Sequence, residues 1–275
     1  MKKRKGLLIP TLLLAGMLAG CNQAPAENKS STTEAAPVST VKADTPDWPR
    51  TFKDSLGKEI VIEKKPEKLA SLWYFYPEIL VALGEPPAAS TEKEYLSSLA
   101  YLTGKLDRAE ELGDKLSPSI EKILSVEPDL ILATEQHEKM YDSLEKVAPV
   151  ITLKSKDIYD DWQYGLRTVA EIIGKEDEAE NVIAKMMKEI TAGREALQSL
   201  QGESVALILS WDGKTFNVLG EGNPVYTLAF DKEKGLGLTP DGAFQGTAMD
   251  TSAITGGPLA IEYALQNIST ALRKL

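Results

Sequence analysis

Residues Glu176 to Leu200, EDEAENVIAKMMKEITAGREALQSL, decide how the rest of the chain is organised. Apolar residues recur every three or four positions along this stretch, and Lys, Glu and Asp fill most positions between them. This spacing places the apolar side chains on one stripe of an α-helix. Gly174 stands before the helix and Gly202 after it, so both of its ends are marked. At about 1.5 Å per residue the helix would be roughly 35 Å long.

Strands and helices alternate before this helix, and a new strand from Ser204 to Ser210 follows it. The predicted strands include Glu59–Ile62 and Val150–Leu153, and the predicted helices include Leu96–Leu102, Ser117–Ser125, Glu138–Val147 and Asp160–Ile173. Such alternation predicts an α/β fold with mostly parallel strands. The simplest interpretation is two α/β lobes joined by one stiff helix. A crossover helix within a single larger domain is the alternative that the pattern leaves open. We expect an N-terminal lobe over 49–175, the joining helix over 176–200 and a C-terminal lobe over 201–275.

The first twenty-one residues have the features of a bacterial export signal. Four basic residues, Lys2 to Lys5, precede the apolar run Gly6 to Leu18, which is short for a membrane-spanning helix. The run ends in Leu18-Ala19-Gly20-Cys21, which matches the lipobox of bacterial lipoproteins. In such proteins the cysteine thiol is acylated, so we expect Cys21 to anchor the chain at the extracytoplasmic face of the cell membrane. The alternative is a free thiol after a plain signal peptide.

Residues 22 to 48 contain mainly Asn, Gln, Ser, Thr, Ala, Pro and Glu. A segment of this composition cannot bury enough apolar surface to offset the entropy lost on ordering. It is predicted to be a flexible tether that spans on the order of 30 Å. A tether of this kind would hold a globular body close to a membrane.

The chain is acidic and contains a single cysteine. Its 31 basic and 41 acidic residues give a formal net charge of −10. This charge disfavours binding to nucleic acid or to anionic lipid and is compatible with a basic protein partner. Since Cys21 has no second cysteine to pair with, burial of a core must stabilise the fold without a disulfide.

In open parallel sheets, ligands bind beyond the carboxyl ends of the strands, and polar or aromatic residues follow three of the predicted strands. The strands in question are Lys68–Leu72, Asp129–Ala133 and Ser204–Ser210. Aromatic side chains at loop tips expose apolar area, which suggests stacking on a ligand, although any one of them can fold back onto the core. The candidate ligand residues are Trp73, Tyr74, Phe75, Tyr76, Glu135, Gln136, His137 and Trp211.

The sequence contains no recognisable catalytic motif. His137 is followed by Glu138, but there is no second histidine to complete a His-Glu-x-x-His zinc helix. A phosphate-binding glycine loop and a Gly-x-Ser-x-Gly elbow are also missing. We therefore expect a protein that is not an enzyme and has neither a metal site nor a cofactor. A lipid-anchored hydrolase is the alternative from a different class.

Several stretches, in the same order along the chain, resemble the substrate-binding lipoproteins of iron-siderophore and vitamin B12 ABC importers. They cover roughly residues 50 to 220. The stretches are the lipobox at Cys21, Asp54–Ile62, Pro66–Lys68, Glu78–Gly84, Ser119–Leu124, Glu127–Ile131, Leu144–Pro149 and Ile172–Glu176. The run from Ile120 to Leu130 is the most specific of them.

This resemblance implies two Rossmann-like lobes bridged by one long helix, with a ferric siderophore captured between them. It also implies a monomer that docks onto permease arginines through an acidic residue on each lobe. Glu121 matches the first docking position, although a carboxylate there also suits a helix N-terminus. Trp73, Tyr74, Tyr76 and Trp211 would contact the chelate, and Glu135, Gln136 and Arg167 would orient it. Haem, with His137 as an axial ligand, and cobalamin are the alternative ligands.

The C-terminal part departs from the family pattern. Thr251 to Pro258 stands where the family repeats a helix followed by a Pro-Asp or Ala-Asp strand, and the sequence given stops at Leu275. We therefore expect an incomplete C-terminal lobe, with a change near 246–250. The second docking residue is not identified, and Glu262 is only a weak candidate for it.

Overall fold

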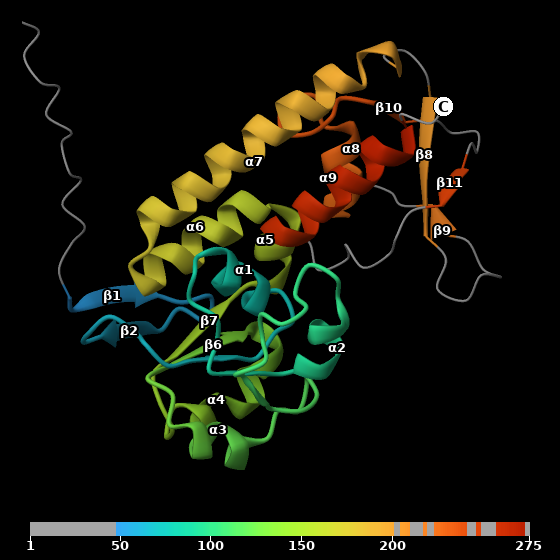
Figure 1. Ribbon diagram of the computed structural model, residues 1–275. Coiled ribbons are helices and arrows are strands. Elements are labelled where there is room, and N and C mark those ends of the chain that lie inside the picture. Colours follow the sequence, from blue (N-terminus) through green and yellow to red (C-terminus); the bar gives the residue numbers. More distant parts are fainter. Residues whose placement is uncertain are drawn as a thin grey trace, which may run out of the picture. The chain divides into compact units, whose positions relative to one another are not determined.

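The computed structural model describes residues 48–200, 204–209, 217–218, 223–240, 246–248 and 257–272 (Figure 1). The predicted lipidation site Cys21, almost all of the predicted tether and the candidate ligand residue Trp211 lie outside these ranges. No helix within the described ranges is both long enough and apolar enough to span a membrane.

A five-stranded parallel sheet forms the centre of the N-terminal lobe. Its strand order is β5-β4-β3-β6-β7. The strands are β3 (Leu69–Ser71), β4 (Ala89–Ser90), β5 (Glu110–Glu111), β6 (Leu130–Thr134) and β7 (Val150–Leu153). A separate antiparallel pair, β1 (Arg50–Lys53) and β2 (Glu59–Ile62), precedes the sheet. The predicted parallel α/β fold is confirmed.

Strand β6 shows why the sheet is buried on both faces. Leu130 and Leu132 belong to a cluster with residues of α1 (Tyr76–Ala82), α6 (Trp162–Ile173) and α7 (Glu176–Ala196). The alternate residues Ile131 and Ala133 belong to a second cluster with residues of α3 (Ile120–Val126) and α4 (Tyr141–Leu144). Because side chains alternate between the two faces of a strand, an unbroken apolar run covers both faces at once.

Helix α7 confirms the predicted apolar stripe, although it ends four residues earlier than expected. Its buried residues are Ala179, Ile183, Met186, Ile190 and Gly193. Gly174 ends α6 in the left-handed conformation, with φ of 68°, as its position before α7 predicted. After Ala196 the chain continues as the short 3-10 helix η2 (Gln198–Leu200).

A second, smaller sheet follows α7. In it β8 (Ser204–Leu209) pairs in parallel with β10 (Thr239–Pro240) and β11 (Gly246–Ala248), and antiparallel with β9 (Asn217–Val218). Its helices are α8 (Pro224–Phe230) and α9 (Pro258–Leu272). Helix α9 packs against α8 and α7, and also against α1 of the first lobe (Figure 1).

Several predicted helices differ from the observed ones at their ends. The helix expected from Ser117 begins at Ile120, because Ser119 rather than Ser117 is its N-cap and accepts a hydrogen bond from the Lys122 amide. The helix expected over 138–147 is the 3-10 helix η1 (Glu135–Met140) followed by α4. The helix expected over 96–102 is α2 (Lys93–Ser98).

The helix expected over 160–173 is interrupted at Asp161. It is divided into α5 (Ser155–Asp160) and α6, and Asp161 between them has the extended backbone conformation of an N-cap. One oxygen of its carboxylate accepts hydrogen bonds from the amides of Gln163 and Tyr164, at 3.0 and 3.1 Å. Capping the second helix therefore outweighs continuation of the first.

Candidate functional site

The loops after β3 and β6 meet at the carboxyl end of the five-stranded sheet, because these two strands are neighbours. The Trp73 ring lies 5.4 Å from the Tyr74 ring and 6.0 Å from the His137 ring, between centroids. Two of the three predicted groups of ligand residues are therefore adjacent. The third, at Trp211, lies outside the described residues.

The aromatic residues after β3 are more buried than the sequence suggested. Trp73 is 9% exposed, Phe75 is 1% exposed and Tyr76 is fully buried. The Tyr76 hydroxyl donates a hydrogen bond to the Ala133 carbonyl at 2.6 Å, and burial raises its pKa well above the ordinary value. The expected exposure at a loop tip is thus wrong for these three rings, which fold back onto the core. Only Tyr74 is partly exposed.

His137 is buried and links the end of β6 to the loop that contains Lys115. Its ring is 1% exposed and both of its nitrogens have partners. The Thr134 amide donates to Nδ1 at 3.1 Å, so Nε2 carries the proton and donates to the Lys115 carbonyl at 2.7 Å. Burial lowers the pKa of His137, although the hydrogen bond that its Nε2 donates to the Lys115 carbonyl opposes this. Since neither nitrogen has a free lone pair, this geometry argues against His137 as an axial haem ligand.

Glu135 holds the start of α5 against the end of β6. Its carboxylate accepts hydrogen bonds from the Ser155 amide, at 2.8 Å, and from the Ser155 hydroxyl. Burial alone would raise the pKa of Glu135, but the hydrogen bonds from Ser155 outweigh it and the pKa is lowered. The neighbouring Gln136 is exposed.

Three residues that the sequence did not single out complete this edge of the sheet. Lys115 Nζ lies 6.0 Å from the centre of the Tyr74 ring and 3.7 Å from Glu92 Oε1. Tyr95, on α2, is 47% exposed and its charge interaction contributes to the raised pKa of Tyr74. Tyr159, on α5, is also close enough to Tyr74 for the two phenols to interact electrostatically, and this interaction contributes to the raised pKa of Tyr159. We call Trp73, Tyr74, Tyr95, Lys115, Glu135 and Tyr159 the carboxyl-edge cluster.

Tyr74 and Tyr159 of this cluster stay protonated at neutral pH. Burial raises the pKa of Tyr74, and burial with smaller contributions from Tyr74 and Asp160 raises the pKa of Tyr159 to about 12. A neutral phenol is a hydrogen-bond donor, and Lys115 adds a positive charge. Tyr74, Tyr159 and Lys115 are therefore the groups of this cluster suited to bind negatively charged oxygen atoms, whereas the Glu135 carboxylate accepts hydrogen bonds from Ser155.

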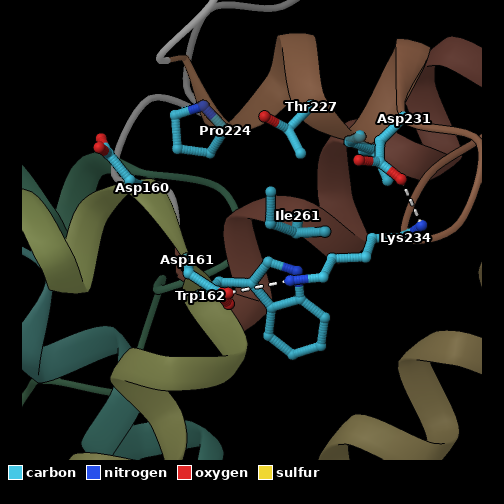
Figure 2. A pocket seen from close by; sticks show the side chains of 9 residues that line it. Asp160, Asp161, Trp162, Pro224, Thr227, Asp231, Lys234 and Ile261 are labelled. Carbon is cyan, nitrogen blue, oxygen red and sulfur yellow. Dashed lines mark hydrogen bonds and ion pairs between the residues drawn. The ribbon is translucent and has the colours of Figure 1, made fainter.

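A cavity of about 130 Å³ lies beside this cluster, where α5 and α6 approach α8 and α9 (Figure 2). Tyr159 of the cluster immediately precedes three residues that line this cavity, Asp160, Asp161 and Trp162. Its lining residues are Asp160, Asp161, Trp162, Pro224, Thr227, Leu228, Asp231, Lys234 and Ile261. Pockets for small ligands usually measure about 300–1,000 Å³, so this cavity is smaller than a siderophore requires.

An ion pair crosses the cavity. Figure 2 shows Lys234 extending to Asp161, and its Nζ lies 3.0 Å from Asp161 Oδ2. Burial raises the pKa of Asp161, but the Tyr164 amide and Lys234 outweigh this and lower it. The pair links the N-terminus of α6 to the loop after α8. Lys234 was not identified from the sequence, since nothing in its local pattern distinguishes it from other surface lysines.

The carboxyl-edge cluster does not include two other predicted functional residues, Arg167 and Glu121. Arg167 points along the outside of α6, where its Nε and Nη2 contact the Glu180 carboxylate of α7 at 2.6 and 3.1 Å. This surface ion pair engages the Arg167 side chain with α7, and the predicted role of Arg167 in orienting the ligand stays a prediction. Glu121 is exposed in the first turn of α3. Among the residues that the structure describes, no cluster of three or more His, Cys, Asp or Glu side chains is arranged to hold a metal ion.

Comparison with known proteins finds one family model that matches. The model for periplasmic binding proteins matches residues 69–228, which is more than half of the chain. The Fe(3+)-citrate-binding protein YfmC of Bacillus subtilis is 27% identical over 78% of this chain. The iron(3+)-hydroxamate-binding protein FhuD of the same organism is 26% identical over 80% of it. The chain spans 69% and 64% of the length of these two relatives.

Solved structures share the fold. A FhuD fold-family component of a Fep/Fec-like ferrichrome ABC transporter from Bacillus subtilis has a TM-score of 0.67 at 20% identity. The match covers 82% of this chain and all of that one. The siderophore-binding protein BauB, solved with two acinetobactin molecules and ferric iron, has a TM-score of 0.62 at 19% identity, covering 82% and 99%. These similarities confirm the expected two-lobed fold.

The buried histidine predicts a loss of stability in mild acid. The pKa of His137 is lowered in the folded state, whereas an unfolded histidine titrates near about 6.5. As the pH falls below that value the unfolded chain binds the proton first, so the free energy of unfolding decreases until the pH passes the folded pKa. Because the chain has one histidine, its Hε1 resonance in NMR identifies the group, and we expect a midpoint below 6.5.

The same resonance recorded in concentrated urea is the control and should titrate near about 6.5. The variant His137→Gln should be less stable at pH 7 and should lose the slope of stability between pH 7 and pH 5.5. A native midpoint at or above the urea value would contradict the lowering of the His137 pKa by burial.

Proposed function

Because the chain belongs to the periplasmic binding protein family, we propose that it captures a ferric siderophore and delivers it to the permease of an ABC importer. The family comprises binding proteins and not enzymes. The observation that carries the proposal is the carboxyl-edge cluster, which gathers Trp73, neutral phenols and Lys115 at the carboxyl end of a parallel sheet. The phenols and the ammonium group would bind the anionic oxygens of the chelate.

Two comparisons support this choice of ligand. The relatives above are described as binding ferric citrate and ferric hydroxamate, and one structural neighbour was solved with a ferric siderophore. In such a chelate the iron is already coordinated, so the protein need not supply metal ligands. Haem is less favoured, because both nitrogens of His137 are engaged within the fold. Cobalamin is included in the binding test below, where saturable quenching by it would identify it as the ligand instead.

The remaining parts of the proposal concern the organisation of the chain. We assign the N-terminal lobe to 49–175, the joining helix to 176–200 and the C-terminal lobe to 201–275. Residues 22–48 would tether the body to a lipid on Cys21 at the extracytoplasmic face of the membrane. Trp211 would contact the ligand from the second lobe, and the protein would act as a monomer.

Binding can be followed by tryptophan fluorescence, because Trp73 lies in the carboxyl-edge cluster and Trp162 lines the adjacent cavity. The panel comprises ferric hydroxamates, ferric catecholates, ferric citrate, haem and cobalamin. Free tryptophan at equal absorbance corrects for light absorbed by the ligand. We expect saturable quenching by one class of iron chelate. No quenching by any of them, together with turnover of a generic ester, would favour the hydrolase instead.

The phenol donors give a sharper test of the site. Tyr74→Phe and Tyr159→Phe each remove one hydroxyl, so each should weaken binding of the quenching chelate by about two- to tenfold, as expected for one lost hydrogen bond. The control is Tyr164→Phe, since Tyr164 is 50% exposed on α6 and belongs to neither the cluster nor the cavity. Unchanged affinity in both test variants would remove the carboxyl-edge cluster from the ligand site.

Docking to the permease predicts a separation of binding from transport. Glu121→Ala should leave chelate affinity unchanged and reduce ligand-stimulated ATP hydrolysis by the permease in proteoliposomes by about tenfold, as for a lost charge pair at an interface. Glu138→Ala, which removes another exposed carboxylate of the same lobe, is the control. A fall in chelate affinity with Glu121→Ala would assign this residue to ligand binding instead.

The lipid anchor is tested by cell fractionation. Cys21→Ser removes the only thiol in the chain, so the protein should move from the membrane fraction to the soluble fraction. Ser31→Ala, a change of similar size in the predicted tether, should leave the protein in the membrane fraction. Membrane association of Cys21→Ser that survives a high-salt wash would exclude acylation as the anchor.

A further inference from the structure

Glu78 is a buried carboxylate at the contact between α1 and α9. It lies in the first turn of α1 and is completely inaccessible to solvent. One of its oxygens, Oε1, accepts a hydrogen bond at 2.6 Å from the amide of Ala260, which lies 182 residues further along the chain. The two helices lie side by side (Figure 1), and α9 begins two residues before Ala260.

This hydrogen bond caps α9 from another helix. The first amides of a helix have no partner within it, and here Pro258 occupies the first helical position and has no amide hydrogen. Gly257, the residue before it, accepts from the Ile261 amide through its carbonyl but has no side chain with which to cap the helix. Glu78 supplies the acceptor that a serine or aspartate would supply locally.

Gly257 is required by this contact because of its size. A Cβ atom at this position would lie 2.6 Å from Glu78 Cδ and 2.7 Å from Glu78 Oε1. Both distances are far below van der Waals contact, so any larger residue would displace the carboxylate or the helix. Gly257 thus leaves room for a side chain from a distant helix.

The energetics favour a fixed contact. Burying a carboxylate without partners is unfavourable, and the Ala260 amide and the positive end of the helix dipole offset this cost. Conversely, losing Glu78 would leave the buried Ala260 amide of α9 without this acceptor. Each group therefore stabilises the position of the other.

Helix α9 forms a wall of two cavities. Ile261 lines the cavity of about 130 Å³ between α6 and α8. On the other side, Leu259, Glu262, Tyr263 and Gln266 line an open cavity of about 200 Å³ together with residues of the loop after α2. The Tyr263 ring lies 5.7 Å from the Tyr101 ring across this second cavity. Any shift of α9 changes the shape of both cavities.

We infer that Glu78 is a positioning residue for ligand binding, because it fixes α9 against the N-terminal lobe. This inference rests on the proposed function for its ligand. Helix α9 contacts α7 and α8 as well as α1, so it forms a second connection between the two lobes in addition to α7. Glu78 fixes the position of α9 relative to α1, and because α9 lines both cavities, this contact also maintains their shape.

The first experiment uses the protein without ligand. Hydrogen exchange is measured on peptides covering α9 in the wild type, Glu78→Gln, Glu78→Ala and Gly257→Ala. We expect protection in the first two turns of α9 to fall at least about tenfold in Glu78→Ala and Gly257→Ala, as for one charge-assisted hydrogen bond lost. Glu78→Gln keeps an acceptor oxygen, so protection of α9 should fall less in this variant. Unchanged protection in all three variants would overturn the inference, whether or not a ligand is known.

The second experiment separates positioning from general stability. Ile123→Ala, in the apolar cluster under α3 that does not include α9, serves as a destabilised control. Affinity for the chelate that quenches the wild type should fall about tenfold in Glu78→Ala, less in Glu78→Gln, and not in Ile123→Ala at temperatures where all are folded. Reduced protection of α9 with unchanged affinity would overturn the positioning role. If no chelate binds the wild type, the proposed function is wrong. The hydrogen-exchange experiment still shows whether Glu78 stabilises the N-terminal turns of α9.

Discussion

Burial of one stripe of α7 is the constraint on which the rest of this structure depends. The same apolar cluster contains Ile183 and Ile190 of this helix, Leu166 of the first lobe, and Leu228 and Leu265 of the second. Each such side chain contributes about 1.5–3 kcal/mol when it is fully buried. Because residues of both lobes pack into one cluster with α7, the helix is the common support against which the two halves are held.

The carboxyl end of the first sheet is ordered by buried polar groups. Tyr76 donates to the end of β6, His137 joins Thr134 to the Lys115 loop, and Glu135 binds the start of α5. A buried polar group without a partner costs about 1–3 kcal/mol, so each of these contacts fixes a loop in one conformation. The partly exposed Tyr74 and Tyr159 rest on this internal network. A site supported in this way loses little entropy when a ligand binds.

Much of the fold follows from local patterns in the sequence. Strands β2 and β7 have the expected ends, and the stripe of α7 and the left-handed Gly174 agree with the spacing that predicted them. The errors concern helix ends, where several capping residues compete. At Ser117 and Ser119, for example, the local sequence allows either cap, and only the position of α3 against the sheet selects the second.

The sequence by itself determined the alternation of strands and helices, the long amphipathic helix and the strand ends at which ligand residues gather, because these depend on periodicity and on the edge rule for parallel sheets. Tertiary structure alone decided that Tyr76 and His137 face inward, that Arg167 pairs with Glu180, and that Lys115, Tyr159 and Lys234 lie at the site. It also decided that Glu78 caps a helix 182 residues away. The physical reason is that burial and pairing depend on residues that are distant in the chain and become neighbours only when the sheets and helices pack.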